Sequence, residues 1–249
     1  MKKNDKQGWM IIGGVVAVFA LLGSLAVYAN VAQKKYDPDT LCPLEGQGPA
    51  VRILIDKTDP WDAGGSARLE KIIRCIKDDL AVSERLSIAV LDESGSEVPT
   101  PVFDMCNPGR GDQANPLYKN QRRIHEKFEA RFDRPLEQML VDILKPGTAP
   151  RSPLLEAVEN FPVAGENDRL VIISDLMQNS QLCSFYLDGE SCAEEKRGQS
   201  DRQEMKRYRS ITVYYVDRGA LARNRKEMVC AFWKEYLGQR AVSFDFQRL

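Results

Sequence analysis

Residues with oxygen-bearing side chains follow two apolar runs of the chain. Asp56, Thr58 and Asp59 come directly after "VRILI", and Ser174 and Asp175 come directly after "RLVII". Carboxylate and hydroxyl oxygens are the ligands that hard divalent cations such as Mg²⁺ or Mn²⁺ prefer. If the two runs are neighbouring strands, these side chains meet at one end of a sheet and form a small oxygen-lined pocket. The residue types therefore indicate a cation site or a site of metal-assisted chemistry.

A local structural role is the alternative for the same kinds of residue. Aspartate and serine at the start of a helix often accept hydrogen bonds from its first backbone N–H groups, and so cap the helix. Ser152 favours this role, because Pro153 and the acidic Glu156 follow it, as at the beginning of many helices. Asp56 and Asp175, taken singly, allow it as well. The sequence leaves a metal cradle and a set of capped polar turns open.

Apolar runs alternate with helical patterns along residues 51–249, and these elements must position the polar side chains. Short runs rich in branched residues, such as 169–174, are typical of strands buried on both faces. The run 101–106 follows a turn-rich segment and is expected to pair back on the preceding strand as a hairpin. We therefore predict an α/β fold: one doubly wound, mostly parallel sheet flanked by helices. The expected strands are 51–56, 85–92, 101–106, 169–174, 211–216 and 241–246, and the expected helices are 67–80, about 116–144 with a break near Pro135, 153–161 and 221–237.

In this order of elements the polar residues resemble the metal-ion-dependent adhesion site of the von Willebrand factor type A (vWA) domain family. That site uses Asp-x-Ser-x-Ser after the first strand, a Thr before a later helix, and an Asp after a central strand. Asp56 matches the first aspartate, and Thr58 offers the hydroxyl of the first serine. Ser152 stands where the family has its threonine, and Asp175 matches the last aspartate. The resemblance covers roughly residues 51–246.

The resemblance implies a fold, a cofactor and a mode of action. The fold is a vWA or Rossmann-like sheet, and the cofactor is Mg²⁺ or Mn²⁺, whose last ligand is a carboxylate of a partner protein. Pro60 departs from the pattern, because it replaces the second serine and has no hydroxyl, so a weaker or lost metal site is expected. Asp59 beside it offers a substitute oxygen. The implied metal ligands are Asp56, Thr58, Ser152, Asp175 and Asp59.

The N-terminal stretch from Trp9 to Ala29 carries no charged residue. Its length matches the roughly 20 apolar residues that a helix needs to cross a bilayer. The lysines before it favour an N-terminus in the cytoplasm. A cleaved signal peptide is the alternative, with Val27 and Ala29 as the small residues before the cut. We expect a cytoplasmic N-terminus at 1–8, a transmembrane anchor at 9–29, a linker at 30–50 and a vWA-like domain outside the cytoplasm at 51–249.

The six cysteines make an even count that suits an oxidising compartment, which for a bacterial chain is the periplasm. Cys183 and Cys192 flank a short segment that contains Asp188-Gly189. We predict that these two cysteines pair and hold part of a long polar loop as a recognition loop. The other pairings stay open. No Cys-x-x-Cys occurs and His125 is the single histidine, so a Cys/His zinc site is not expected.

Two classes of function fit these residues. The net charge of −1 gives no basic nucleic-acid footprint. The chain has no Gly-x-Ser-x-Gly elbow, no Walker loop and no His-Glu-x-x-His. We therefore expect a binding module for membrane or envelope proteins, anchored in the membrane and without catalytic residues. The alternative is a metal-dependent hydrolase or phosphoryl-transfer enzyme that uses Asp56, Asp59 and Asp175 around the cation.

Overall fold

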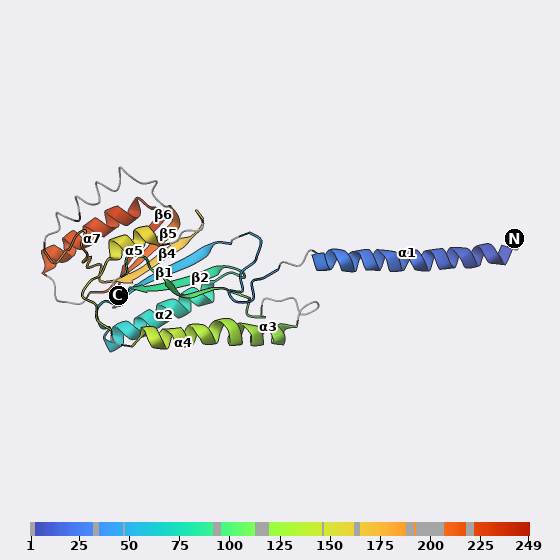
Figure 1. The fold of residues 1–249 in the computed structure, drawn as a ribbon, viewed down its shortest axis with the longest axis horizontal. Helices are drawn as coiled ribbons and strands as arrows, with labels where there is room; N and C mark the ends of the chain where they lie inside the picture. The colour runs from blue at the N-terminus through green and yellow to red at the C-terminus, as the bar shows by residue number, and fades with distance from the viewer. Residues whose placement is uncertain are drawn as a thin grey trace.

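Six strands pair into one sheet in the part of the chain that the computed structural model describes, in the order β3-β2-β1-β4-β5-β6. Figure 1 shows this sheet between two layers of helices. The strands are β1 Ala50–Asp56, β2 Arg85–Leu91, β3 Pro101–Cys106, β4 Arg169–Ser174, β5 Tyr208–Tyr215 and β6 Ala241–Arg248. The described residues are 3–31, 35–46, 48–91, 96–112, 120–145, 147–161, 165–187, 192, 207–217 and 222–249.

All neighbouring strands of the sheet are parallel except β3, which pairs antiparallel with β2. The prediction of a mostly parallel sheet with a hairpin at its second and third strands is therefore confirmed. The chain places β2 and β3 on one side of β1, and then returns to add β4, β5 and β6 on the other side. This reversal between β1 and β4 is a topological switch point, next to which open α/β sheets bind ligands at the carboxyl ends of their strands.

Each face of the sheet packs against its own helices, which lie above and below the sheet in Figure 1. α2 and α4 pack on the face that carries Ile53 and Ile55 of β1. α5 and α7 pack on the opposite face, which carries Leu54. Burial on both sides explains why the central strands are almost entirely apolar. The helices are α1 Lys3–Val31, α2 Ala63–Asp79, α3 Gln121–Phe128, α4 Arg134–Ile143, α5 Leu154–Asn160 and α7 Arg223–Gly238.

α3 continues into α4 through one π-helical turn, Glu129–Asp133. The predicted break near Pro135 takes the form of this π turn, which interrupts the α-helical hydrogen bonding while the helical path continues. Pro135 lies in the first turn of α4. Proline has no N–H and crowds the preceding turn of a helix. The wider π turn, in which the Arg134 N–H donates to the carbonyl five residues earlier, accommodates it. The part of the predicted helix before residue 120 lies outside the described residues.

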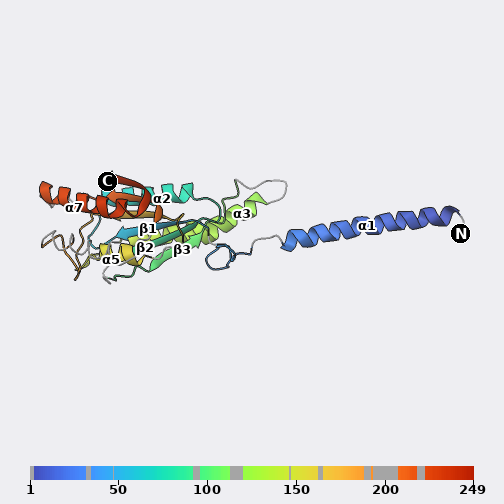
Figure 2. The same ribbon diagram turned by 90° about the horizontal axis from the view of Figure 1, so that it is seen from above.

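The N-terminal helix α1 lies apart from the α/β domain in both views of the chain (Figures 1 and 2). Several of its large apolar side chains are exposed, among them Trp9, Phe19 and Tyr28. Within the described ranges, no helix combines the length and the apolarity that crossing a membrane requires. The anchor at 9–29 therefore stays a prediction.

Two disulfides form among the described residues, Cys42–Cys106 and Cys183–Cys192. The second is the pair that the short intervening segment predicted, and it is confirmed. The first is one of the pairings that the spacing of the cysteines left open. The remaining two cysteines are free thiols. Because disulfides persist in oxidising surroundings, these bonds match an extracytoplasmic location.

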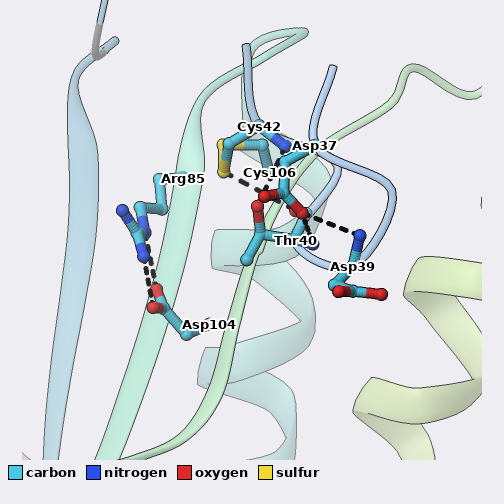
Figure 3. Close-up of a disulfide and its surroundings, with 7 residues drawn as sticks. All are labelled: Asp37, Asp39, Thr40, Cys42, Arg85, Asp104 and Cys106. Carbon is cyan, nitrogen blue, oxygen red and sulfur yellow. Dashed lines mark hydrogen bonds and ion pairs between the residues drawn. A yellow bond between two sulfur atoms is a disulfide. The ribbon is translucent and has the colours of Figure 1, made fainter. Parts of the chain in front are cut away.

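The Cys42–Cys106 disulfide fastens residues 35–46, the anchoring segment, to the end of β3 (Figure 3). The Cys106 N–H also donates to the Thr40 carbonyl at 2.8 Å. Within the segment, the Asp37 carboxylate accepts hydrogen bonds from the Thr40 N–H and from the N–H of the residue before it, and these bonds lower the pKa of Asp37. Much of the stretch that we expected to be a linker is thus folded against the domain.

Candidate functional site

β1 and β4 bring Asp56 and Ser174 together at the switch point. The strands are parallel neighbours in which Ile55 pairs with Ile173, so Asp56 and Ser174 follow as the next pair. Side chains alternate between the two faces of a strand. Both residues therefore share the face of Leu54, which is covered by α5 and α7. The Ser174 hydroxyl donates to Asp56 Oδ2 at 2.7 Å.

Thr58 engages the other oxygen of the Asp56 carboxylate. Its N–H and its hydroxyl both donate to Asp56 Oδ1, at 3.1 Å and 2.7 Å. The Thr58 carbonyl accepts a hydrogen bond from the Ala149 N–H at 2.7 Å, which attaches the loop before α5 to the end of β1. Asp56 is fully buried and Thr58 nearly so. The two residues form the floor of the site, not its rim.

Ser152 comes from that loop and reaches the same carboxylate. Its hydroxyl donates to Asp56 Oδ2 at 3.1 Å. The Ser152 backbone pairs with that of Asn179, with N–H to carbonyl distances of 2.9 Å and 2.8 Å, so the loop before α5 and the loop after β4 are joined. The alternative role of Ser152, a helix cap, is not the one it has, because α5 begins after Pro153 without a side-chain cap. Its Leu155 N–H is satisfied instead by Gln178 Oε1 at 2.7 Å.

The result is one buried carboxylate that accepts hydrogen bonds from three hydroxyls and one backbone N–H. We call Asp56, Thr58, Ser152 and Ser174 the hydroxyl cluster. A hydroxyl that donates its proton keeps lone pairs with which it can face a cation or accept a further bond. Ser174 was named at this strand end but not among the expected ligands. The two-residue alternation along β4 is the sequence signal that assigns it to the cluster.

Asp175 and Asp59 lie at the same edge of the sheet. Asp175 is buried, and its Oδ1 accepts a hydrogen bond from the Met177 N–H at 3.0 Å, which is a local polar turn. Asp59 is half-buried, and Pro60 beside it is exposed. Across the ranges that the structure describes, no group of three or more His, Cys, Asp or Glu residues is arranged to hold a metal ion. The oxygens that bond the Asp56 carboxylate are those of the Thr58, Ser152 and Ser174 hydroxyls.

The loop after β4 is fixed by hydrogen bonds to α5 and α7. Leu176 is buried with a φ of 62°, and its carbonyl accepts a hydrogen bond from Trp233 Nε1 of α7 at 2.9 Å. Gln178 is fully buried and donates to Glu156 Oε2 of α5 at 2.8 Å. These bonds fix the backbone on which Ser174 and the residues after it stand. The hydroxyl cluster is thus pre-arranged by long-range contacts, and none of these contacts is visible in local sequence patterns.

A charged hollow of about 510 Å³ lies beside the hydroxyl cluster, at the carboxyl ends of β5 and β6. Tyr215 in its wall pairs with Ser174 in the strand register. Burial raises the pKa of Tyr215 to about 12. Asp217 accepts a hydrogen bond from Lys226 at 2.7 Å and another from Arg248. The hollow beside the hydroxyl cluster is therefore lined by a mixed, largely paired set of charges.

Comparison with known proteins gives no assignment of this chain: no protein-family model matches it, and no curated protein matches it in sequence. The vWA resemblance therefore rests on the residues quoted above. The order of the strands and the position of the hydroxyl cluster at the switch point are the structural facts on which a function can be argued.

Proposed function

We propose that the chain is a membrane-tethered binding module that holds a partner protein outside the cytoplasm, at the carboxyl edge of its sheet. The observation that carries this proposal is the hydroxyl cluster, a fully buried carboxylate surrounded by hydroxyls at the topological switch point. Ligands of open α/β sheets bind at this place. A recognition site needs rigid polar groups in a fixed arrangement, and the bonds from α5 and α7 supply that rigidity.

A divalent cation suits this set of donors. Hard cations take oxygen ligands, and hydroxyls leave the bound ion electrophilic enough to attract a carboxylate. Thr58, Ser152 and Ser174 would offer their hydroxyl oxygens, and Asp56 would hold those hydroxyls in place and balance the charge. Mg²⁺ or Mn²⁺ would supply the attraction for an acidic side chain of the partner. The small number of carboxylates in the cluster predicts modest affinity.

Cation binding is measured with Mn²⁺ and the full chain in detergent, by the electron paramagnetic resonance signal of free Mn²⁺. We expect saturable binding, competed by Mg²⁺, that weakens about 10-fold or more in Thr58→Val and in Ser152→Ala. Each substitution removes a hydroxyl with little change in shape. Thr212→Val, on β5 away from the cluster, is the matched control. If the Mn²⁺ affinity were unchanged in both cluster variants, the proposal that the hydroxyl cluster binds a cation would be wrong.

Partner capture is measured by chemical cross-linking in membranes, followed by purification in detergent. We expect one reproducible cross-linked species that decreases on addition of a chelator and in Asp175→Ala, because both remove the cation or the carboxylate beside it. Asp245→Ala, an exposed aspartate of β6, serves as the control and should capture normally. Near-ultraviolet circular dichroism verifies that the variants remain folded. If neither the chelator nor Asp175→Ala changed the capture of the partner, the cluster would be a polar turn and binding would use another surface.

The tether is the second part of the proposal. The uncharged run from Trp9 to Ala29 and the exposed apolar side chains of α1 favour a helix that needs lipid around it. With the N-terminal lysines retained inside, the domain and its C-terminus lie outside the cytoplasm. A reporter that is active only in the cytoplasm, joined after Leu249, should then stay inactive. An active reporter would show that the domain lies in the cytoplasm, which is not the oxidising compartment that the disulfides require.

A further inference from the structure

The chain between α1 and the domain is short. α1 ends at Val31, and the anchoring segment 35–46 is fixed to β3 by the Cys42–Cys106 disulfide and by backbone hydrogen bonds. Only residues 32–34 separate the two. Three residues span at most about 10 Å, since an extended chain covers roughly 3.3–3.6 Å per residue. If α1 lies in a membrane, as the proposed function requires, the domain cannot move far from the lipid surface.

The amino edge of the sheet is the edge that this short connection holds near the membrane. β1 begins at Ala50, and the anchoring segment lies beside it around a hollow that includes Cys42, Ala50 and Cys106. In Figure 1 the amino ends of the strands face α1, and the C-terminus at the end of β6 lies on the far side. The amino edge therefore meets the lipid headgroups, and the hydroxyl cluster points away from them.

A second hollow, of about 580 Å³, opens along the same amino edge, between the starts of β1, β4, β5 and β6. Arg169 and Arg209 line it, together with Ser210 and Ser243, which pair with each other in the strand register. Glu84 forms an ion pair with Arg169 at 3.0 Å. We call these five residues the amino-edge hollow. Its lining has two guanidinium groups, two hydroxyls and one carboxylate, so it carries a positive charge in excess.

Arg209 is the group that carries this excess. Its side chain is exposed, and among the described residues it enters no ion pair. The Asp168 side chain, whose backbone carbonyl accepts a bond from the Arg209 N–H, is occupied by Arg52 at 2.8 Å in a buried pair and by the Ala50 N–H. Planar guanidinium groups bind phosphate oxygens through two parallel hydrogen bonds. Hydroxyls next to such a group can donate hydrogen bonds to the remaining oxygens of the same phosphate.

We infer that the amino-edge hollow binds the phosphate of an anionic phospholipid headgroup in the membrane that holds α1. Arg209 bonds the phosphate, Ser210 and Ser243 donate to its remaining oxygens, and Arg169 adds charge from the flank. The inference rests on the proposed tether, because the short connection to α1 is what brings the hollow to the lipid. The attraction of one arginine at an anionic surface corresponds to about a fivefold gain in binding.

Native mass spectrometry of the full chain in detergent tests the inference. The probes are phosphatidylglycerol and phosphatidylcholine with identical acyl chains, titrated separately. We expect phosphatidylglycerol to bind about fivefold more tightly than phosphatidylcholine, and Arg209→Gln and Arg209→Glu to abolish this preference. Arg223→Gln, an exposed arginine of α7, is the matched control and should keep it. Binding of Mn²⁺ should be the same in all of these variants, so a failure here is separate from a failure of the hydroxyl cluster.

Three results would overturn the inference. Equal binding of the two lipids would show that the hollow does not select a headgroup by its net charge. A phosphatidylglycerol preference that survives Arg209→Gln would place the lipid on other basic groups, such as the lysines around α1. Tight binding of inorganic phosphate alone, with displacement of phosphatidylglycerol at equal concentration, would make the hollow a site for free phosphate.

Discussion

Replacing Asp56 by alanine should lower the free energy of unfolding by about 3–5 kcal/mol. The carboxylate is fully buried and accepts hydrogen bonds from the Thr58 N–H and hydroxyl and from the hydroxyls of Ser152 and Ser174. Alanine leaves these donors without their acceptor in a dry site, where an unsatisfied donor costs about 1–3 kcal/mol. The hydroxyls can turn toward other acceptors, which limits the sum. Urea unfolding of the full chain in detergent, followed by tryptophan fluorescence, measures the loss.

Two substitutions make this result specific. Asp56→Asn keeps the shape and one acceptor oxygen, so it should cost clearly less than Asp56→Ala. Asp175→Ala should cost about 1 kcal/mol, the value of a typical side-chain hydrogen bond such as the one from Met177. If Asp56→Ala and Asp175→Ala were equally stable, the hydroxyl cluster would not be the structural centre of this edge.

Removing the Cys42–Cys106 disulfide should cost about 4 kcal/mol of unfolding free energy. The two cysteines are 64 positions apart, and closing a loop of that length removes much of the freedom of the unfolded chain. The variant should carry serine at both positions, so that no new free thiol can pair with another cysteine. Its unfolding in urea is compared with that of the unsubstituted chain under oxidising conditions.

The other disulfide provides the internal control. Cys183 and Cys192 are only 9 positions apart, so the double serine variant at these sites should lose about 2.5 kcal/mol, clearly less than the first. The opposite ranking would mean that the anchoring segment contributes little to the fold. The domain from β1 onward would then be stable without the attachment of the anchoring segment to β3.

The sheet was predictable from the sequence because its strands are buried on both faces. Continuous apolar runs such as Val171–Ile173 have few alternatives, and the turn-rich segment before Pro101 marks the hairpin. The π turn before Pro135 was not predictable, since a proline in a helical pattern fits a break and a bulge equally well. The Cys42–Cys106 pair was also beyond reach, because six cysteines allow about 15 pairings and only the folded chain selects one.

The candidate site was predictable in three of its four members, Asp56, Thr58 and Ser152, but not in Ser174 or in its bonds. The order of Asp56, Thr58 and Ser152 along the chain indicated that they meet, and the structure brings them together. Ser152 also matched the pattern of a helix cap, and local rules could not decide between the two roles. The decision came from Gln178, which is distant in sequence and satisfies the start of α5 instead. Tertiary contacts of this kind leave no local pattern.

The attachment of the anchoring segment to β3 also decides how the molecule carries mechanical load. If a partner bound at the carboxyl edge and α1 were held in a membrane, as proposed, a pull between them would stretch β1 along its length. β1 has parallel neighbours on both sides, so the pull strains its ladder hydrogen bonds together in shear rather than one after another. The Cys42–Cys106 bond gives the tension a second, covalent route from α1 into β3. Under the proposed function, this arrangement would make the domain resist a pull applied between α1 and the carboxyl edge of the sheet.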